Sequence, residues 1–157
     1  MPAPDACGLS VLRATPGDAP DCAKLHADLF DPAWDTRSFE SLLAQPTAVA
    51  FVARRRAAGE TVAFILGQVA ADEAEVLVLG VRADRRRQGV ATRLIAALIE
   101  AAREAGARTL FLEVAAGNTA ALALYRGQRF EQRGRRKAYY VTATTAAVDA
   151  VTFALAL

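Results

Sequence analysis

Residues 76–92 read VLVLGVRADRRRQGVAT, and this stretch decides the fold of the chain. Its first six residues are apolar or glycine, which is typical of a β-strand covered on both faces. Its last four open a helical pattern over 89–105, with Val90, Leu94 and Leu98 four residues apart and Gly106 as a stop. A second apolar segment follows at 109–115. Strand, helix and strand in this order predict a right-handed βαβ unit with two parallel strands.

The segments on either side predict a sheet in which most neighbours are antiparallel. Further strands are expected at 9–14, 47–53 and 61–70, with two more between 130 and 157. Further helices are expected from the turn at 15–18 to residue 30, over 36–45, and from 118 to 126. We therefore expect one α/β (α+β) domain over 1–157, with a mixed, mostly antiparallel sheet, a central parallel βαβ unit and flanking helices. Residues 1–8 are expected to form a loose arm.

Composition narrows the class of protein. The 157 residues include 19 basic and 17 acidic side chains, a net charge of +2, so no dominant polyanion-binding surface is expected. Hydrophobic residues make up 54%, too many for a disordered chain. The N-terminus lacks the pattern of a signal peptide, and the apolar runs are shorter than the roughly 20 residues of a membrane helix. We expect a cytoplasmic protein that does not bind membranes.

The start of the long helix is the strongest candidate for binding chemistry. Free N–H groups and the positive end of a helix dipole bind phosphate at such a position. Gly89 lets the backbone approach an anion closely, Ala91 is small, and the arginines at 85–87 add positive charge. The alternative is a solvated basic loop that only caps the helix. The pattern is neither a dinucleotide GxGxxG nor a Walker loop.

Three more residues are candidates for a site. Glu113 lies within the apolar segment LFLEV, where a carboxylate costs on the order of several kcal/mol unless it is solvated, paired or neutralised. A carboxylate withdrawn from water is a stronger base. The alternative for Glu113 is an edge or bulge position in water. Asn118 and Tyr125 share one helix face, and their alternatives are an ordinary N-cap and a plain core residue.

These residues together resemble the GNAT N-acetyltransferases. Arg86-x-x-Gly89-x-Ala91 after an apolar strand is similar to the acetyl-CoA signature of that superfamily, Gln/Arg-x-x-Gly-x-Gly/Ala. Further residues resemble the bacterial ribosomal-protein alanine N-acetyltransferase (RimI) branch of that superfamily. They are Glu113, Asn118, Ala121, Leu124 and Tyr125, Arg135-Arg136 with Tyr139-Tyr140, Phe30 with Trp34, and the segment 68–75. The resemblance extends over nearly the whole chain from Leu9.

The resemblance implies a reaction and a site. The reaction is transfer of the acetyl group of acetyl-CoA to a primary amine by direct attack, with Glu113 as general base and Tyr125 as general acid. The residues implied to bind acetyl-CoA are Leu79, Gly80, Val81, Arg86, Arg87, Gln88, Gly89, Val90, Ala91, Thr92 and Asn118. No metal is implied.

The implied acceptor is a protein N-terminal amine, of the ribosomal-protein alanine type. Alternatives are a small-molecule amine, another protein, or a catalytically silent CoA-binding module, although a pure binder would need neither Glu113 nor Tyr125. The basic runs 54–56 and 133–137 are expected to be solvated turns rather than nucleic-acid sites. A contact with the cofactor, or with a ribosomal or acidic peptide acceptor, is the alternative for the second run. Cys7 and Cys22 form no metal motif or disulfide framework and are not expected to be nucleophiles. His26 is expected to be an ordinary helix surface or core residue.

Overall fold

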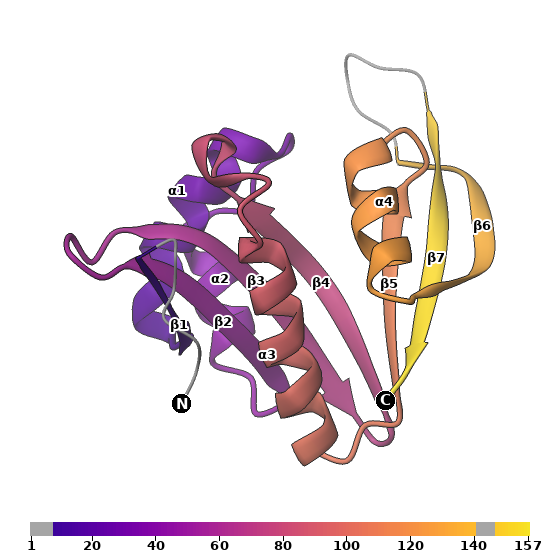
Figure 1. Cartoon of the computed structure of the whole chain (residues 1–157), viewed down its shortest axis with the longest axis horizontal. Helices are drawn as coiled ribbons and strands as arrows, with labels where there is room; N and C mark the ends of the chain where they lie inside the picture. Colours follow the sequence, from indigo (N-terminus) through magenta and orange to yellow (C-terminus); the bar gives the residue numbers. More distant parts are fainter. Residues whose placement is uncertain (1–7, 141–146) are drawn as a thin grey trace.

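The computed structural model describes residues 8–140 and 147–157 (Figure 1). The helices and strands in chain order are β1 (Leu9–Arg13), η1 (Pro16–Asp18), α1 (Ala19–Leu29), α2 (Thr36–Leu43), β2 (Ala48–Arg55), β3 (Thr61–Ala70), β4 (Glu73–Val81), η2 (Ala83–Arg85), α3 (Val90–Glu104), β5 (Thr109–Ala115), α4 (Thr119–Gly127), β6 (Glu131–Tyr140) and β7 (Val148–Ala156). Every predicted helix and strand is present, with ends shifted by a few residues. The predicted arm, apart from Gly8, lies outside the described residues.

One seven-stranded sheet runs through the molecule in the order β1-β2-β3-β4-β5-β7-β6. All neighbours are antiparallel except β4 and β5, which are parallel and are joined through α3. This confirms the predicted mixed sheet with a central βαβ unit. Helices α3 and α4 lie on one face of the sheet, and α1 and α2 lie on the other (Figure 1).

The two parallel strands separate after a short stretch of pairing. Strand β4 pairs with β5 only where Glu73–Glu75 lie beside Thr109–Phe111. Beyond that point the two ribbons diverge, while β4 stays paired with β3 up to Val81 (Figure 1). Strand β4 also carries one extra residue, Leu77, relative to β3. Such a bulge bends its strand, so we attribute part of the divergence to it.

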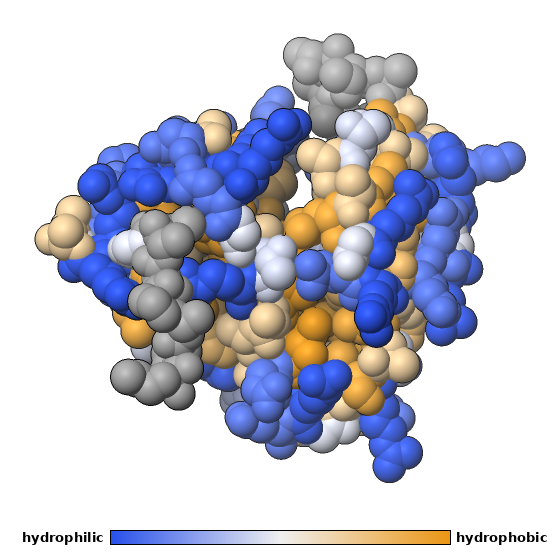
Figure 2. Space-filling model, in the orientation of Figure 1, coloured by the Kyte–Doolittle hydropathy of each residue, from blue (hydrophilic) through white to orange (hydrophobic). Residues whose placement is uncertain are grey.

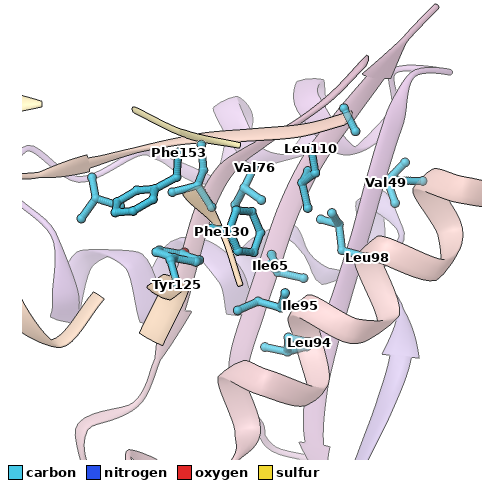
Figure 3. Packing of buried hydrophobic residues seen from close by; sticks show 14 of the residues in the cluster. Val49, Ile65, Val76, Leu94, Ile95, Leu98, Leu110, Tyr125, Phe130 and Phe153 are labelled. Carbon is cyan, nitrogen blue, oxygen red and sulfur yellow. The ribbon is translucent and has the colours of Figure 1, made fainter. Parts of the chain in front are cut away.

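Helix α3 is held on the sheet by the apolar stripe that its sequence predicts. Leu94, Ile95 and Leu98 are each at most 1% exposed. They belong to one buried cluster with strand residues that include Ile65 and Leu110 (Figure 3). Burying one such side chain stabilises a fold by roughly 1.5–3 kcal/mol. This packing fixes the start of α3 relative to the end of β4.

The layer formed by α1 and α2 corrects one prediction. Phe39 of α2 and Phe64 of β3 meet edge to face at 5.5 Å in its core. Beside that core the buried carboxylate of Asp18 pairs with the guanidinium of Arg54. The run 54–56 is therefore not simply a solvated turn, because it begins within β2 and neutralises a buried charge. Its partner lies far away in the sequence, so the local charge pattern does not reveal the pair.

The basic run 133–137 lies in a strand, so the prediction of a turn is wrong. It forms the middle of β6, the last strand of the sheet. An edge strand exposed on both faces needs no apolar alternation, which removes the usual sequence signal. The ion pairs of this run are Arg133–Glu131, Arg135–Asp149 and Arg136–Glu113, at 3.5, 2.6 and 3.0 Å.

Candidate active site

A cavity of about 600 Å³ opens where β4 and β5 diverge. Figure 2 shows the surface hollowed in this region. Its walls come from the end of α1, the second half of β4, the loop before α3, and α4. The predicted residues in its lining are Leu79, Gly80, Val81, Arg86, Arg87, Gly89, Val90, Ala91, Thr92, Asn118 and Tyr125. The structure thus brings together every predicted acetyl-CoA residue except Gln88, and adds the predicted acid.

The start of α3 has the features of an anion site. Gly89 is the N-cap residue, with a φ of +77° in the left-handed region, and it provides no side-chain acceptor. Arg87 also has a positive φ, +60°. The first N–H groups of the helix, at 90–92, therefore remain available at the positive end of the helix dipole. A phosphate bound in the cavity could accept hydrogen bonds from them.

Arg85 gives a second indication of an anion. Its Nε atom is buried and has no hydrogen-bond partner among the described residues, and Arg85 lines the same cavity. An unpaired buried donor costs about 1–3 kcal/mol, and more when the group is charged. A phosphate oxygen would satisfy this donor. Sequence reasoning counted Arg85 only as flanking charge, because nothing local distinguishes one of three consecutive arginines.

Gln88 is the predicted cofactor residue that does not line the cavity. Its Nε2 atom donates a hydrogen bond to the backbone carbonyl of Asp84 at 3.2 Å. Nearby, the Nε of Arg86 donates to the carbonyl of Val81 at 3.4 Å. Both contacts lie within the loop between β4 and α3 or join it to the end of β4. They help to set the loop that places Gly89.

The end of β4 offers backbone groups to the cavity. Leu79, Gly80 and Val81 are paired with β3 on one side and lie beyond the last β5 pair on the other. A linear ligand with amide groups can add to such an edge as an extra strand. Position 80 requires a glycine, because a Cβ atom there would come within 2.9 Å of the Phe64 ring.

Asn118 and Tyr125 combine structural contacts with a place in the cavity lining. The Oδ1 of Asn118 accepts a hydrogen bond from the N–H of Ala121 at 3.1 Å and caps α4. Tyr125 is 5% exposed, and its ring meets Phe130 edge to face at 5.4 Å (Figure 3). Burial raises the pKa of Tyr125 to about 12. Its hydroxyl therefore stays protonated at neutral pH and is able to donate a proton.

Glu113 lies on the other side of the sheet. Strand β5 lies between β4 and β7 in the sheet, but Glu113 follows the last β5 residue that pairs with β4, so its backbone has a ladder partner only in β7. Its neighbours Leu112 and Val114 are buried in the cluster under α3, whereas Glu113 lines a separate cavity of about 350 Å³. The Glu113 side chain is 19% exposed, and its Oε1 lies 3.0 Å from the Nε of Arg136. The carboxylate is therefore paired, and it does not share a cavity with Tyr125.

Tyr140 is a neighbour of Glu113 that the site prediction did not include. Burial raises the pKa of Tyr140, and the negative charge of Glu113 raises it further. The pair Tyr139-Tyr140 entered the sequence analysis only through the family resemblance, because no spacing rule connects β6 with β5.

The sequence analysis also did not predict that the end of α1 forms a wall of the 600 Å³ cavity. Leu29 and Phe30 line the cavity, and Phe30 lies where the helical periodicity stops. Behind them, His26 is 3% exposed, and its Nδ1 accepts a hydrogen bond from the N–H of Trp34 at 3.0 Å. Its ring stacks on Phe30 at 4.5 Å and on Trp34 at 5.0 Å. His26 is thus a buried residue that fixes the segment between α1 and α2.

Helix α4 supplies three more lining residues that were not predicted. They are Ala120, Ala121 and Leu124. Ala121 and Leu124 entered the sequence analysis as part of the family pattern but were given no role. Helical spacing from Asn118 and Tyr125 could have indicated Ala121, which lies three residues after the first and four before the second, because residues three and four apart share a face.

Comparison with known proteins identifies the class that this fold and cavity define. Residues 19–130 match the Acetyltransferase (GNAT) family, and the chain belongs to that family. The ribosomal protein bS18-alanine N-acetyltransferase of Escherichia coli K12 is 40% identical over 97 residues, which are 62% of this chain and 65% of that protein. The match thus spans slightly less than two thirds of that relative's length.

Two further relatives align over most of their length. The N-alpha-acetyltransferase RimI of Mycobacterium tuberculosis is 36% identical over 138 residues, 84% of each chain. A crystal structure of the ribosomal-protein alanine N-acetyltransferase of Escherichia coli has a TM-score of 0.85 at 30% identity, covering 94% of this chain and 93% of that one. These findings confirm the resemblance to the superfamily and to its RimI branch.

Three further features of the described residues concern metal ligands, membrane helices and cysteines. Within 8–140 and 147–157, no three His, Cys, Asp or Glu side chains are grouped so as to hold a metal ion. The described helices include none that is long and apolar enough to cross a membrane. Cys22 is buried, and burial, followed by the charges of Asp18 and Asp21, raises the pKa of its thiol to about 12. Cys7 lies outside the described residues.

Proposed function

We propose that this protein transfers the acetyl group of acetyl-CoA to the α-amino group of a protein N-terminus, of the ribosomal-protein alanine type. The observation that carries the proposal is the cavity between β4 and α4. In this cavity an uncapped helix start, the buried Nε atom of Arg85 without a hydrogen-bond partner among the described residues, and an unpaired strand edge lie together. Membership of the acetyltransferase family and the names of the relatives support the same reaction.

The residues present fit acetyl-CoA group by group. The phosphates would accept hydrogen bonds from the N–H groups at 90–92 and from Arg85. The second contact would give the unpaired Nε atom of Arg85 an acceptor. The linear arm, which carries amide groups, would follow the backbone of Leu79–Val81. When bound, acetyl-CoA supplies an activated acyl group. Asn118 and Tyr125 line the α4 side of the same cavity.

Glu113 and Tyr125 would act from opposite sides of the sheet. An α-amino group has a reference pKa near 8, so most of it is protonated at neutral pH. The Glu113 carboxylate would accept a proton from the amine, directly or through water. The neutral Tyr125 hydroxyl would donate a proton to the departing thiolate. Because these residues line different cavities, the acceptor and the acetyl donor would meet at the opening between β4 and β5.

Direct transfer needs no covalent enzyme intermediate. The raised pKa of Cys22 keeps its thiol protonated at neutral pH, and Cys22 lines neither of the two cavities. A protonated, buried thiol is a poor nucleophile. Both substrates would therefore be bound before the acetyl group moves.

The proposed partner is an acceptor protein, for which a ribosomal protein is the leading candidate, and not a nucleic acid. Arg133, Arg135 and Arg136 each pair with a carboxylate, so this run does not form a continuous basic surface. We propose that the protein acts in the cytoplasm, where such acceptors are made. A small-molecule amine, another protein acceptor and a silent CoA-binding module are the alternatives.

A thiol-release assay separates these possibilities. The panel contains peptides with a free N-terminal alanine, the same peptides with a blocked N-terminus, and small amines. We expect CoA release with the free peptides and none with the blocked ones. Release with small amines alone would favour the small-molecule alternative. Tight binding of acetyl-CoA without release on any acceptor would favour the silent module.

A further inference from the structure

The loop that leads to the start of α3, residues 82–89, is tied by one arginine to a turn much earlier in the chain. Arg82 directly follows β4, and its N–H donates a hydrogen bond to the carbonyl of Val62 at 2.8 Å, which continues the pairing of β4 with β3. The side chain of Arg82 contacts two carboxylates. One belongs to Asp84 within the loop, and the other belongs to Glu60 in the turn between β2 and β3.

The contacts of the Arg82 guanidinium are short and numerous. Its Nε and Nη2 atoms donate to Oδ1 and Oδ2 of Asp84 at 2.6 and 3.0 Å, and its Nη1 atom donates to Oε1 of Glu60 at 2.6 Å. Arg55 extends the network, with its Nη1 atom 3.5 Å from Oε2 of Glu60. A single exposed ion pair contributes little, but an arginine that grips a carboxylate at two points within a charge network is the exception.

Hydrogen bonds carry this network on to the proposed phosphate site. The carbonyl of Arg82 accepts a hydrogen bond from the N–H of Arg85 at 2.8 Å, and the carbonyl of Asp84 accepts one from Nε2 of Gln88 at 3.2 Å. Arg85 has the buried Nε atom without a partner among the described residues, and Gln88 directly precedes Gly89, the N-cap of α3. The network therefore acts on both parts of the site, the guanidinium of Arg85 and the helix start.

The conformation of the loop needs such support. Arg87 has a φ of +60°, in the left-handed region, which is unfavourable for a residue with a Cβ atom. Backbone in such a conformation persists when the surrounding structure holds it. The contacts of Arg82 and Asp84 provide fixed points on the side of the loop that comes before Arg87.

We propose that Arg82 is a positioning residue for acetyl-CoA, which holds the loop 82–89 in its binding conformation by bracing it against Glu60. The inference rests on the proposed function, because it takes the start of α3 as the site of the phosphates. Neither Arg82 nor Glu60 lines the 600 Å³ cavity. Their effect on acetyl-CoA therefore passes through the loop and not through contact with the ligand.

The negative charge of Glu60 makes the test discriminating. Acetyl-CoA is an anion, so electrostatics alone predicts that removing this carboxylate leaves its affinity unchanged or raises it. Positioning predicts the opposite sign. We expect Glu60→Ala to weaken acetyl-CoA binding by about three- to tenfold in calorimetry, with an unchanged KM for the acceptor. Glu60→Gln keeps an oxygen that can accept from Arg82, so it should restore part of the affinity.

Glu131→Ala is the matched control. It removes a carboxylate from another exposed ion pair, formed with Arg133 on β6 at 3.5 Å, and Glu131 lines neither cavity. Its affinity for acetyl-CoA should equal that of the unmodified protein. An unchanged or higher affinity in Glu60→Ala would overturn the inference and leave the proposed function standing. A lower melting temperature with unchanged affinity would overturn it too, because the network would then be merely structural.

Hydrogen exchange in the free protein provides a readout that needs no ligand. Amide protons of the loop, above all the N–H of Arg85, should exchange at least about threefold faster in Glu60→Ala than in the unmodified protein. Amide protons in the last turns of α3 should be unaffected. If the unmodified protein binds no acetyl-CoA, the proposed function fails and exchange alone decides about the brace. Faster exchange would support it, and unchanged exchange would overturn it.

Discussion

The carboxylate of Glu113 lies 3.0 Å from a guanidinium and outside the cavity proposed for acetyl-CoA. Glu113→Gln keeps the shape of the side chain and removes its basicity. We therefore expect turnover to fall by about 10²–10⁴-fold, with nearly unchanged affinity for acetyl-CoA. Steady-state kinetics and calorimetry measure the two effects separately. Turnover at the level of the unmodified protein would show that the carboxylate is structural.

Tyr125 has a ring in the core and a place in the cavity lining, and one substitution separates the two roles. Tyr125→Phe keeps the contact with Phe130 and removes the hydroxyl. A hydrogen bond lost from a purely structural site would cost about 1 kcal/mol of stability and leave turnover intact. A catalytic hydroxyl predicts a normal melting temperature and a loss of turnover of at least about tenfold. Nearly full turnover would exclude Tyr125 as the acid.

Because of His26, we expect the protein to become less stable in mildly acidic solution. Burial lowers its pKa below the reference value of 6.5. The unfolded chain therefore binds the proton at a higher pH than the folded protein does, so stability falls as the pH drops below 6.5. The fall stops once folded His26 is protonated too. Asp35, Asp84 and Asp149, whose pKa values lie below 3.8, contribute only in more acidic solution.

The substitution His26→Asn tests this dependence. The asparagine carbonyl can replace Nδ1 as the acceptor for the N–H of Trp34, but it does not titrate. Melting temperatures measured from pH 7 down to about pH 5 should decline less steeply in the variant than in the unmodified protein. Parallel curves for the two proteins would assign the decline to other groups.

Helix α3 offers a matched pair of positions for testing the anion site. Gly89 at its start and Gly106 after its end both have left-handed φ values, +77° and +94°, and a Cβ atom at either would meet no atom within 4 Å. Glutamate should therefore cost about 1–2 kcal/mol at each position. Only Gly89→Glu places a carboxylate at the helix start that would bind phosphate. Calorimetry should show a large loss of acetyl-CoA affinity for Gly89→Glu and almost none for Gly106→Glu.

A loss of affinity common to both variants would indicate unfolding, which circular dichroism would detect. Equal affinity for acetyl-CoA in both variants and in the unmodified protein would show that the phosphates do not bind at the start of α3.

At the scale of elements, helices and strands were predicted correctly where apolar residues form a regular pattern in the sequence. The stripe of α3 and the apolar run of β4 placed the βαβ unit correctly, because each element buries one face or both. Strand β6 shows the opposite case. Both of its faces are exposed, so its sequence shows charged residues without an apolar period. The run 133–137 was therefore interpreted as a turn.

At the scale of the whole molecule, the residues of the acetyl-donor cavity were predictable, whereas the relation between its parts was not. Gly89 and Ala91 carry a local signal for a phosphate-binding helix start. The separation of Glu113 from Tyr125 depends on the pleat of β5 and the position of α4, which no spacing reveals. The Arg136–Glu113 pair is formed by residues of β6 and β5, with β7 between these strands.

The exposed edge of β6 has a consequence for how copies of this protein behave toward one another. An unpaired strand edge can add a strand from a second copy, and charged side chains and irregular register oppose this. Strand β6 has both, with exposed Arg133 and Lys137 and two shifts in its register with β7. Replacing both residues by valine should raise light scattering with concentration. Arg103→Val, at an exposed position on α3, should not. The basic run then protects the sheet against aggregation, a task that requires no bound partner.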